Sequence, residues 1–208
     1  MSEALRIVSL AEPLAHLAAA TGAIARRLDA MGLVPDGEER VIGELTMSSF
    51  LKLVRGAADR GIGSDIVQQM SAGEQDVAAL RPLLEKLNAV LEDSPVPDRE
   101  AARLLSIFEP DELADLVGVS TSSLRRYARG DREPSPEVAM RLHFLALVVG
   151  DLAGAYDDLG IRAWFRRRRA LLGDRVPRDL LRGEWLPEDD DPSSVRELAA
   201  ALTAPNAT

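Results

Sequence analysis

Residues 112–130 read ELADLVGVSTSSLRRYARG, and this stretch decides the fold of the middle of the chain. A small residue, Ala114, stands where a second helix could cross the first closely, and Gly118 accepts the positive φ that a tight turn needs. Apolar residues flank both positions and can bury the helix pair: Leu113, Val117 and Val119. The stretch therefore predicts two short helices joined by a tight turn, with Asp111 near the start of the first helix.

The second helix of this pair is predicted between Ser120 and Gly130. Ser120 is a good N-cap, Gly130 is a good C-terminal stop, and Leu124 and Tyr127 lie three residues apart on one inner face. The outer face carries short hydroxyl residues followed by arginines: Thr121, Ser122, Ser123, Arg125, Arg126 and Arg129. No acidic residue occurs between positions 115 and 131, so this face is predicted to be basic throughout.

Two helices of this kind are typical of a helix-turn-helix that binds double-stranded DNA. Short hydroxyl residues allow close approach to base edges in the major groove, and Arg125 or Arg126 could pair bidentately with guanine. Ser120 and the first amides of the helix suit a phosphate. The predicted DNA-binding residues are Ser120, Thr121, Ser122, Ser123, Arg125, Arg126 and Arg129. The alternative is a helical hairpin whose basic face meets only solvent.

The composition of the whole chain predicts an all-α fold. The 208 residues are 46% hydrophobic and only 4% aromatic, and they are rich in helix-favouring Ala, Leu and Arg. No convincing pair of strands is found. There is no cysteine, which excludes disulfides and fits the cytoplasm. The net charge of −9 argues against indiscriminate nucleic-acid binding, but a specific binder needs only a local basic surface.

No stretch approaches the roughly 20 apolar residues of a membrane helix, and residues 1–10 lack the pattern of an export signal. We therefore expect a cytoplasmic protein that does not enter a membrane. No catalytic motif is found, the two histidines are far apart in the sequence, and neither a metal nor a cofactor is expected. We expect the protein not to be an enzyme.

Three segments are predicted along the chain. Residues 93–98 read DSPVPD, and two prolines so close together should end the helices on both sides and form a linker. The expected segments are an N-terminal helical domain at 1–96, the helix-turn-helix domain at 98–159, and a last segment at 160–208. After the helix-turn-helix, Ser135 is expected to cap a long helix with one apolar stripe: Leu142, Leu145, Val149, Leu152, Tyr156 and Leu159.

The N-terminal segment shows two apolar stripes with helical spacing. A helix after Ser9 carries the first: Leu14, Leu17, Thr21, Ile24, Leu28 and Met31. A later helix carries the second: Val77, Leu80, Leu84, Leu87 and Leu91. Pro82 is expected to kink or split that later helix. A further helix is suggested between them by Ile42, Leu45, Phe50, Leu53 and Val54. The two stripes could form a dimerisation surface or could pack on each other as a bundle core.

Residues 112–130, followed by Pro134-Ser135-Pro136, resemble the Xre-type helix-turn-helix. After Trp164, residues 172–181 read LGDRVPRDLL, and taken together residues 98–202 look like the Xre/MbcA/ParS antitoxins. The resemblance implies a C-terminal toxin-binding domain, a RES-type toxin that consumes NAD as partner, and repression of the protein's own operon. The matching positions are Trp164, Arg175, Pro177, Leu180 and Leu181.

The arginine run at 166–169 has two interpretations that the sequence leaves open. The run could hold DNA phosphates or an acidic partner surface, or it could be a solvated helix face. Trp164 and Phe165 beside it are expected to be core residues. Three functions follow from the whole sequence: an antitoxin-like autorepressor that binds DNA, an antitoxin that acts mainly by protein contact, and a transcription factor whose N-terminal helices bind a ligand or partner. A homodimer is expected because helix-turn-helix proteins usually read paired half-sites.

Overall fold

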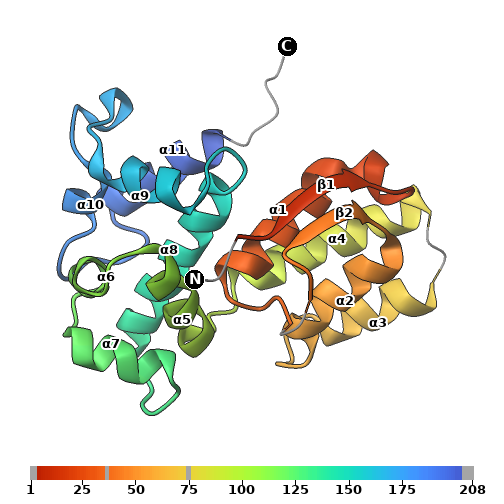
Figure 1. Ribbon diagram of the computed structural model, residues 1–208, viewed down its shortest axis with the longest axis horizontal. Helices are drawn as coiled ribbons and strands as arrows, with labels where there is room; N and C mark the ends of the chain where they lie inside the picture. The colour runs from red at the N-terminus through yellow and green to blue at the C-terminus, as the bar shows by residue number, and fades with distance from the viewer. Residues whose placement is uncertain (1–3, 36–37, 74–75, 203–208) are drawn as a thin grey trace. The chain divides into compact units, whose positions relative to one another are not determined.

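The computed structural model describes residues 4–35, 38–73 and 76–202. The chain divides into two compact units, residues 2–94 and residues 95–208, and each is described by itself (Figure 1). Helices dominate both units, so the all-α prediction is confirmed for the architecture. Across the described ranges, no helix is long and apolar enough to cross a membrane.

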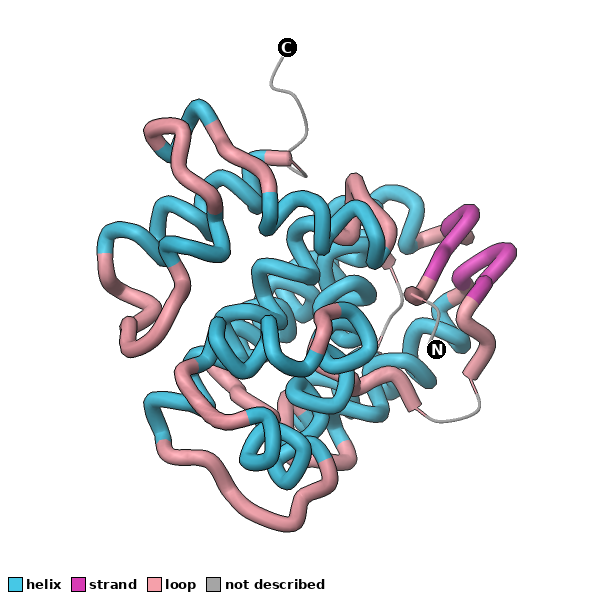
Figure 2. The backbone as a smooth tube through the Cα atoms, turned by 60° about the vertical axis from the view of Figure 1, so that its left-hand side comes forward, coloured by secondary structure: helices cyan, strands magenta, loops and turns pink. Residues whose placement is uncertain are grey.

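The first unit combines helices with one small sheet. Its elements are β1 (Arg6–Leu10), the 3₁₀-helix η1 (Leu14–Leu17), α1 (Ala18–Ala30), β2 (Val41–Leu45), α2 (Met47–Ala58), α3 (Ser64–Ala72) and α4 (Val77–Glu92). Strands β1 and β2 pair in parallel, with Arg6 opposite Val41 and Leu10 opposite Leu45 (Figure 2).

This sheet corrects two sequence expectations, that the chain holds no strand pair and that residues 42–54 form one helix. Strand β2 stops just before Thr46, which is the N-cap of α2. The Thr46 side chain accepts the Ser49 amide at 3.3 Å, and Ser49 Oγ accepts the Thr46 amide at 2.8 Å. The strands are five residues long and show no regular alternation of burial. Apolar runs that short do not distinguish strand from helix by their spacing.

The two apolar stripes of the first unit form its core. Helices α1 and α4 pack on each other. Ile24 and Leu28 of α1 are fully buried, and so are Leu84 and Leu87 of α4. The bundle-core interpretation is therefore confirmed. Helix α4 continues through Pro82, so the expected split does not occur, although a proline there removes one backbone hydrogen bond. The expected kink stays a prediction.

The second unit is built around α8 (Pro136–Leu152). Its other elements are α5 (Pro97–Ile107), α6 (Pro110–Val117), α7 (Thr121–Ala128), α9 (Asp158–Arg166), the 3₁₀-helix η2 (Ala170–Leu172), α10 (Pro177–Leu180) and α11 (Asp190–Ala201). Residues 141–150 of α8 are all buried, and α5, α6 and α11 pack against this helix. The linker prediction agrees with the structure, because α4 ends at Glu92 and Pro97 opens α5.

The long helix after the helix-turn-helix ends earlier than its apolar stripe predicted. Helix α8 stops at Leu152, and Asp157 begins α9 by accepting the Gly160 amide at 2.7 Å. Tyr156 and Leu159 are exposed rather than buried. An N-capping aspartate competes with continued helix because it satisfies the amides of a new first turn.

Candidate nucleic-acid interface

The turn between α6 and α7 depends on Gly118. This residue ends α6 with a φ of 72°, a left-handed conformation that side chains with a Cβ rarely adopt. The Val119 amide donates to the Ala114 carbonyl at 3.0 Å and closes the helix end. A Cβ at Gly118 would also lie 2.7 Å from the Gly183 carbonyl oxygen. Glycine is therefore required both by the backbone angle and by the close neighbour.

Helix α7 is capped at its start and anchored by its inner face. Ser120 is the N-cap, and its Oγ accepts the Ser123 amide at 3.2 Å. Leu124 and Tyr127 are buried and hold α7 against the second unit, chiefly against α5. The predicted register of the helix is confirmed, because the residues expected inside lie inside and the turn occurs at the expected glycine.

The seven predicted DNA-binding residues all lie along α7 or at its ends. Five are exposed and two are half-buried: Ser120, Ser122, Arg125, Arg126 and Arg129, then Thr121 and Ser123. The guanidinium groups of Arg125 and Arg126 have no hydrogen-bond or ion-pair partner within the described ranges. Their guanidinium groups therefore meet solvent and remain available to an anionic ligand.

Two other members of this set make local contacts. The Thr121 hydroxyl donates to Asp111 at 2.7 Å and ties the start of α7 to α6. Arg129 Nε donates to Asp131 at 2.7 Å, and both side chains are more than half exposed. An exposed pair of this kind contributes little to stability and can exchange its partner. Thr121 thus has a structural contact, whereas Arg129 can still reach outward.

The acidic side of α6 is matched by arginines from later in the chain. Three pairs form: Glu109 with Arg162 at 3.7 Å, Glu112 with Arg166 at 2.6 Å, and Asp115 with Arg182 at 3.4 Å. The Glu112 pair is bidentate, since Arg166 Nε also donates to Glu112 at 2.9 Å. Hydrogen bonding to Glu112 raises the pKa of Arg166. These pairs offset negative charge next to the basic helix.

Three of the four arginines in the run at 166–169 make contacts within the second unit. Arg166 pairs with α6, and Arg168 donates to the Asp174 carbonyl at 3.1 Å. Arg169 lies 4.9 Å from the centre of the Trp164 ring and donates to the Trp164 carbonyl at 3.2 Å. The two sequence interpretations stay open, because Arg166, Arg167 and Arg168 are exposed and Arg169 is half-buried.

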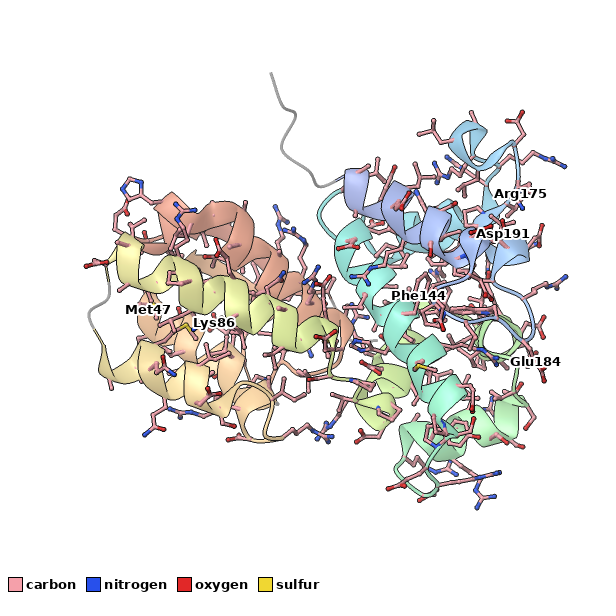
Figure 3. All side chains as sticks on the ribbon, turned by 180° about the vertical axis from the view of Figure 1, so that it is seen from behind. Met47, Lys86, Phe144, Arg175, Glu184 and Asp191 are labelled. Atoms are coloured by element: carbon pink, nitrogen blue, oxygen red, sulfur yellow. The ribbon has the colours of Figure 1, made fainter. Side chains whose placement is uncertain are left out.

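The residues predicted to bind a toxin or other partner lie largely within the core. Trp164 and Leu181 are 1% and 0% exposed, and Pro177 is buried. Arg175 is exposed and pairs with Asp191 of α11 at 2.8 Å (Figure 3). Leu180 is half-buried. The expectation that Trp164 belongs to the core is confirmed. As a partner-binding set these positions remain a prediction, and their side chains reach the surface only in part.

One residue with a central position was missed by the sequence analysis. Trp185 is 5% exposed, stacks edge-on against Phe144 at 5.1 Å, and donates its indole N–H to the carbonyls of Leu116 and Leu181 at 2.9 and 2.8 Å. The only available signal was a second tryptophan just after the LGDRVPRDLL pattern. Its partner in α6 lies 69 residues earlier, beyond the range of any spacing argument.

A buried acid–histidine pair joins the first and last helices of the predicted DNA-binding region. His143 Nδ1 lies 2.6 Å from Glu100 Oε1, and both residues are buried. Burial raises the pKa of Glu100, and the hydrogen bond to His143 opposes that shift. The pair links α5 to α8, and α5 is the helix on which α7 packs.

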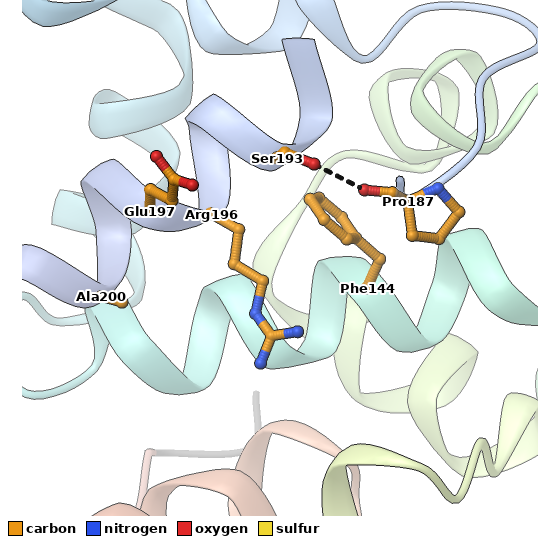
Figure 4. A pocket seen from close by; sticks show the side chains of 6 residues that line it. All are labelled: Phe144, Pro187, Ser193, Arg196, Glu197 and Ala200. Atoms are coloured by element: carbon orange, nitrogen blue, oxygen red, sulfur yellow. Dashed lines mark hydrogen bonds between the residues drawn. The ribbon is translucent and has the colours of Figure 1, made fainter. Parts of the chain in front are cut away.

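A shallow groove of about 360 Å³ lies between α8 and α11 (Figure 4). It is lined by Phe144, Pro187, Ser193, Arg196, Glu197 and Ala200. The Ser193 hydroxyl donates to the Pro187 carbonyl at 3.2 Å, and Arg196 approaches Asp151 at 4.0 Å. These polar groups are engaged within the unit. The part of the chain that the structure describes holds no group of three or more His, Cys, Asp or Glu side chains suited to a metal ion.

Comparison with known families agrees with this geometry. Residues 99–143 match the family model described as helix-turn-helix, a range that runs from α5 into α8 and includes all of α6 and α7. No curated protein and no solved structure gave a match. The chain therefore carries an Xre-like helix-turn-helix, the domain of DNA-binding transcriptional regulators.

Proposed function

We propose that this regulator binds operator DNA sequence-specifically by placing α7 in the major groove, and that it represses its own promoter. The exposed outer face of α7 carries the proposal. Arg125 and Arg126 project from a helix that is capped, anchored and free of acidic residues, and their guanidinium groups have no partner among the described residues. A groove-reading helix needs a fixed inner face and unpaired donors on its outer face.

Each part of α7 has a distinct role in this proposal. Arg125 and Arg126 read guanine by bidentate hydrogen bonds, and Ser122 approaches base edges near the start of the helix. Ser120 and the neighbouring amides contact a phosphate, which sets the register of the protein on the duplex. The net charge of −9 keeps binding away from arbitrary DNA, since phosphate attraction is then confined to this surface.

The protein is proposed to act as a homodimer. Reading two half-sites about 34 Å apart requires two copies of α7 on one face of the duplex. Sedimentation of the full chain, alone and with duplex, gives the number of copies. One chain per operator at saturation would contradict this part of the proposal.

The test is genome-wide binding of the tagged chain beside an Arg125→Ala/Arg126→Ala variant. A matched control removes the same charge from exposed arginines outside α7, Arg167→Ala/Arg178→Ala. Each bidentate contact is worth about 1–3 kcal/mol, so the α7 variant should lose its peaks and the control should keep them. Peaks at its own promoter would support autorepression, whereas dispersed peaks would indicate a broader regulator. Peaks that persist in the α7 variant would refute the placement of DNA on this helix.

A second candidate is an antitoxin that neutralises a RES-type toxin by protein contact. The loop 169–175 favours it, because Leu171 is 83% exposed at a point where the backbone is braced. The Arg169 amide donates to the Arg175 carbonyl at 3.0 Å, and Asp174 adopts a left-handed φ of 57°. A rigid loop that presents an apolar side chain suits a protein partner.

Co-expression with a RES-type toxin encoded next to this gene tests the second candidate. Wild type should relieve the growth arrest that the toxin causes, and Leu171→Asp should not. Relief that is equal for the two chains would exclude contact through this loop. Failure of wild type to bind or neutralise such a toxin would leave the DNA-binding regulator as the better description.

A further inference from the structure

The end of α6 is completed by groups from elsewhere in the second unit. The last carbonyls of a helix lack partners within the helix and must be satisfied by other donors. At this end, the Leu116 carbonyl accepts the Trp185 indole N–H at 2.9 Å, and the Val117 carbonyl accepts the Arg141 guanidinium at 3.2 Å. These are the two residues immediately before Gly118, so the donors act at the turn itself.

Trp185 and Arg141 are also joined to each other. Arg141 Nε donates to the Trp185 carbonyl at 2.7 Å, and its guanidinium carbon lies 5.9 Å from the centre of the Trp185 ring. Both residues are buried, at 5% and 6% exposure. A shared buried network of this kind holds its members in one geometry, because any member left unpaired would be a costly buried polar group.

The segment 181–185 approaches the same turn through its backbone. The Gly183 amide donates to the Asp115 carbonyl at 3.3 Å, and the Gly183 carbonyl leaves no room for a Cβ on Gly118. The Leu181 carbonyl accepts the second hydrogen bond of the Trp185 indole at 2.8 Å. The segment thus touches the final turn of α6 and the glycine that follows it.

We infer that segment 181–185, through Trp185, positions the α6–α7 turn and so sets the orientation of α7 on DNA. The inference rests on the proposed function, because it concerns how that surface is held. Ser120, the cap of α7, is only two residues beyond Gly118, so a shift at the turn moves the whole outer face of α7. Binding surfaces lose affinity when their side chains move by about 0.5 Å or more from the productive geometry.

Trp185 is in this role a positioning residue that touches no DNA. Chains whose turn is misplaced do not bind, and the apparent affinity falls with the fraction that remains competent. The coupling is reciprocal, so bound DNA must also stabilise the hydrogen bonds of Trp185. A ligand or partner that displaced segment 181–185 would release DNA for the same reason.

The experiment compares Trp185→Phe with Trp164→Phe in the full-length chain. Both remove a buried indole from the second unit, but only Trp185 donates to the turn. The probe is a duplex that wild type selects from a random-sequence pool. Trp185→Phe should bind it more weakly, by up to about tenfold, the largest factor that about 1.4 kcal/mol of lost buried hydrogen bonding allows. Its salt dependence should match wild type because no phosphate contact is lost, and Trp164→Phe should bind like wild type.

Two measurements keep the inference separate from the proposed function. Amide exchange at residues 116–121 without DNA should be faster in Trp185→Phe than in Trp164→Phe, which tests the turn alone. In wild type, bound duplex should slow exchange of the Trp185 indole proton and leave that of Trp164 unchanged. This second measurement uses wild type alone, so it does not depend on whether a variant folds.

If wild type selects no duplex, the proposed function fails, and the amide exchange alone decides whether Trp185 holds the turn. If wild type binds and the two variants bind equally well, the positioning inference is overturned while the proposed function stands. Equal amide exchange in the two variants, or an unchanged Trp185 indole signal on DNA, overturns it as well.

Discussion

Replacing Gly118 by alanine tests the close approach at the helix-turn-helix directly. An alanine there must adopt a left-handed φ, which costs about 1–2 kcal/mol. Its Cβ would also lie 2.7 Å from the Gly183 carbonyl oxygen and 3.1 Å from Arg141. Overpacking against such neighbours costs about 1–3 kcal/mol. Gly118→Ala should therefore lower the free energy of unfolding by about 2–5 kcal/mol, the sum of the two costs.

Gly130→Ala is the matched control for this prediction. Gly130 has almost the same φ, 71° against 72°, but a Cβ there would have no atom within 4 Å. Gly130→Ala should lower the free energy of unfolding only by the conformational cost of about 1–2 kcal/mol. The difference between the two variants reports the contacts of that Cβ with the Gly183 carbonyl and with Arg141, both of which come from outside the turn.

The assay is urea unfolding of the full chain followed by tryptophan fluorescence. The chain has two tryptophans, Trp164 and Trp185, and both lie in the second unit, so the signal reports this unit alone. Equal loss in Gly118→Ala and Gly130→Ala would refute the argument that Gly183 limits the turn. A larger loss of unfolding free energy in Gly130→Ala than in Gly118→Ala would contradict it as well.

Three further predictions concern the same unit. Ser120→Ala should cost about 1 kcal/mol of unfolding free energy through the lost N-cap, and Ser122→Ala close to nothing, as measured by urea unfolding. Leu124→Ala, at a fully buried position, should cost about 2–5 kcal/mol in the same assay. Burial raises the pKa of Glu100, so the folded chain holds that proton more tightly than the unfolded chain, and this contribution to stability is lost as pH rises above the ordinary value of 4.5. Glu100→Gln, beside His143, should therefore gain stability relative to wild type with rising pH, by at most about 1.4 kcal/mol per pH unit, and a pH-independent difference would contradict the assignment.

Much of the candidate site was predictable from sequence because its determinants are local. A left-handed glycine, a hydroxyl N-cap and apolar residues three apart each act within a few residues of backbone. Gly118, Ser120 and the buried pair Leu124 and Tyr127 therefore lie where the spacing predicted. The outer face of α7 follows from the same register, since an anchored inner face leaves the remaining positions outside.

The predictions that went wrong concern segments whose partners decide their structure. Residues 41–45 have the apolar content of a short helix or a short strand, and they form a strand because β1 pairs with them. The stripe beyond Leu152 continued the helical spacing, but Asp157 starts a new helix there. In both places a competing hydrogen-bond arrangement is more favourable than continued helix.

Composition and contacts within one or two helical turns were sufficient to predict the helical class, the division near residue 95 and the exposed outer face of α7. Which arginines pair within the fold, how Glu100 meets His143, and how Trp185 completes the end of α6 became clear only once the helices were seen packed together. The Glu100–His143 and Leu116–Trp185 contacts join residues 43 and 69 positions apart. Their formation depends on how helices pack around α8, and no local pattern records that packing.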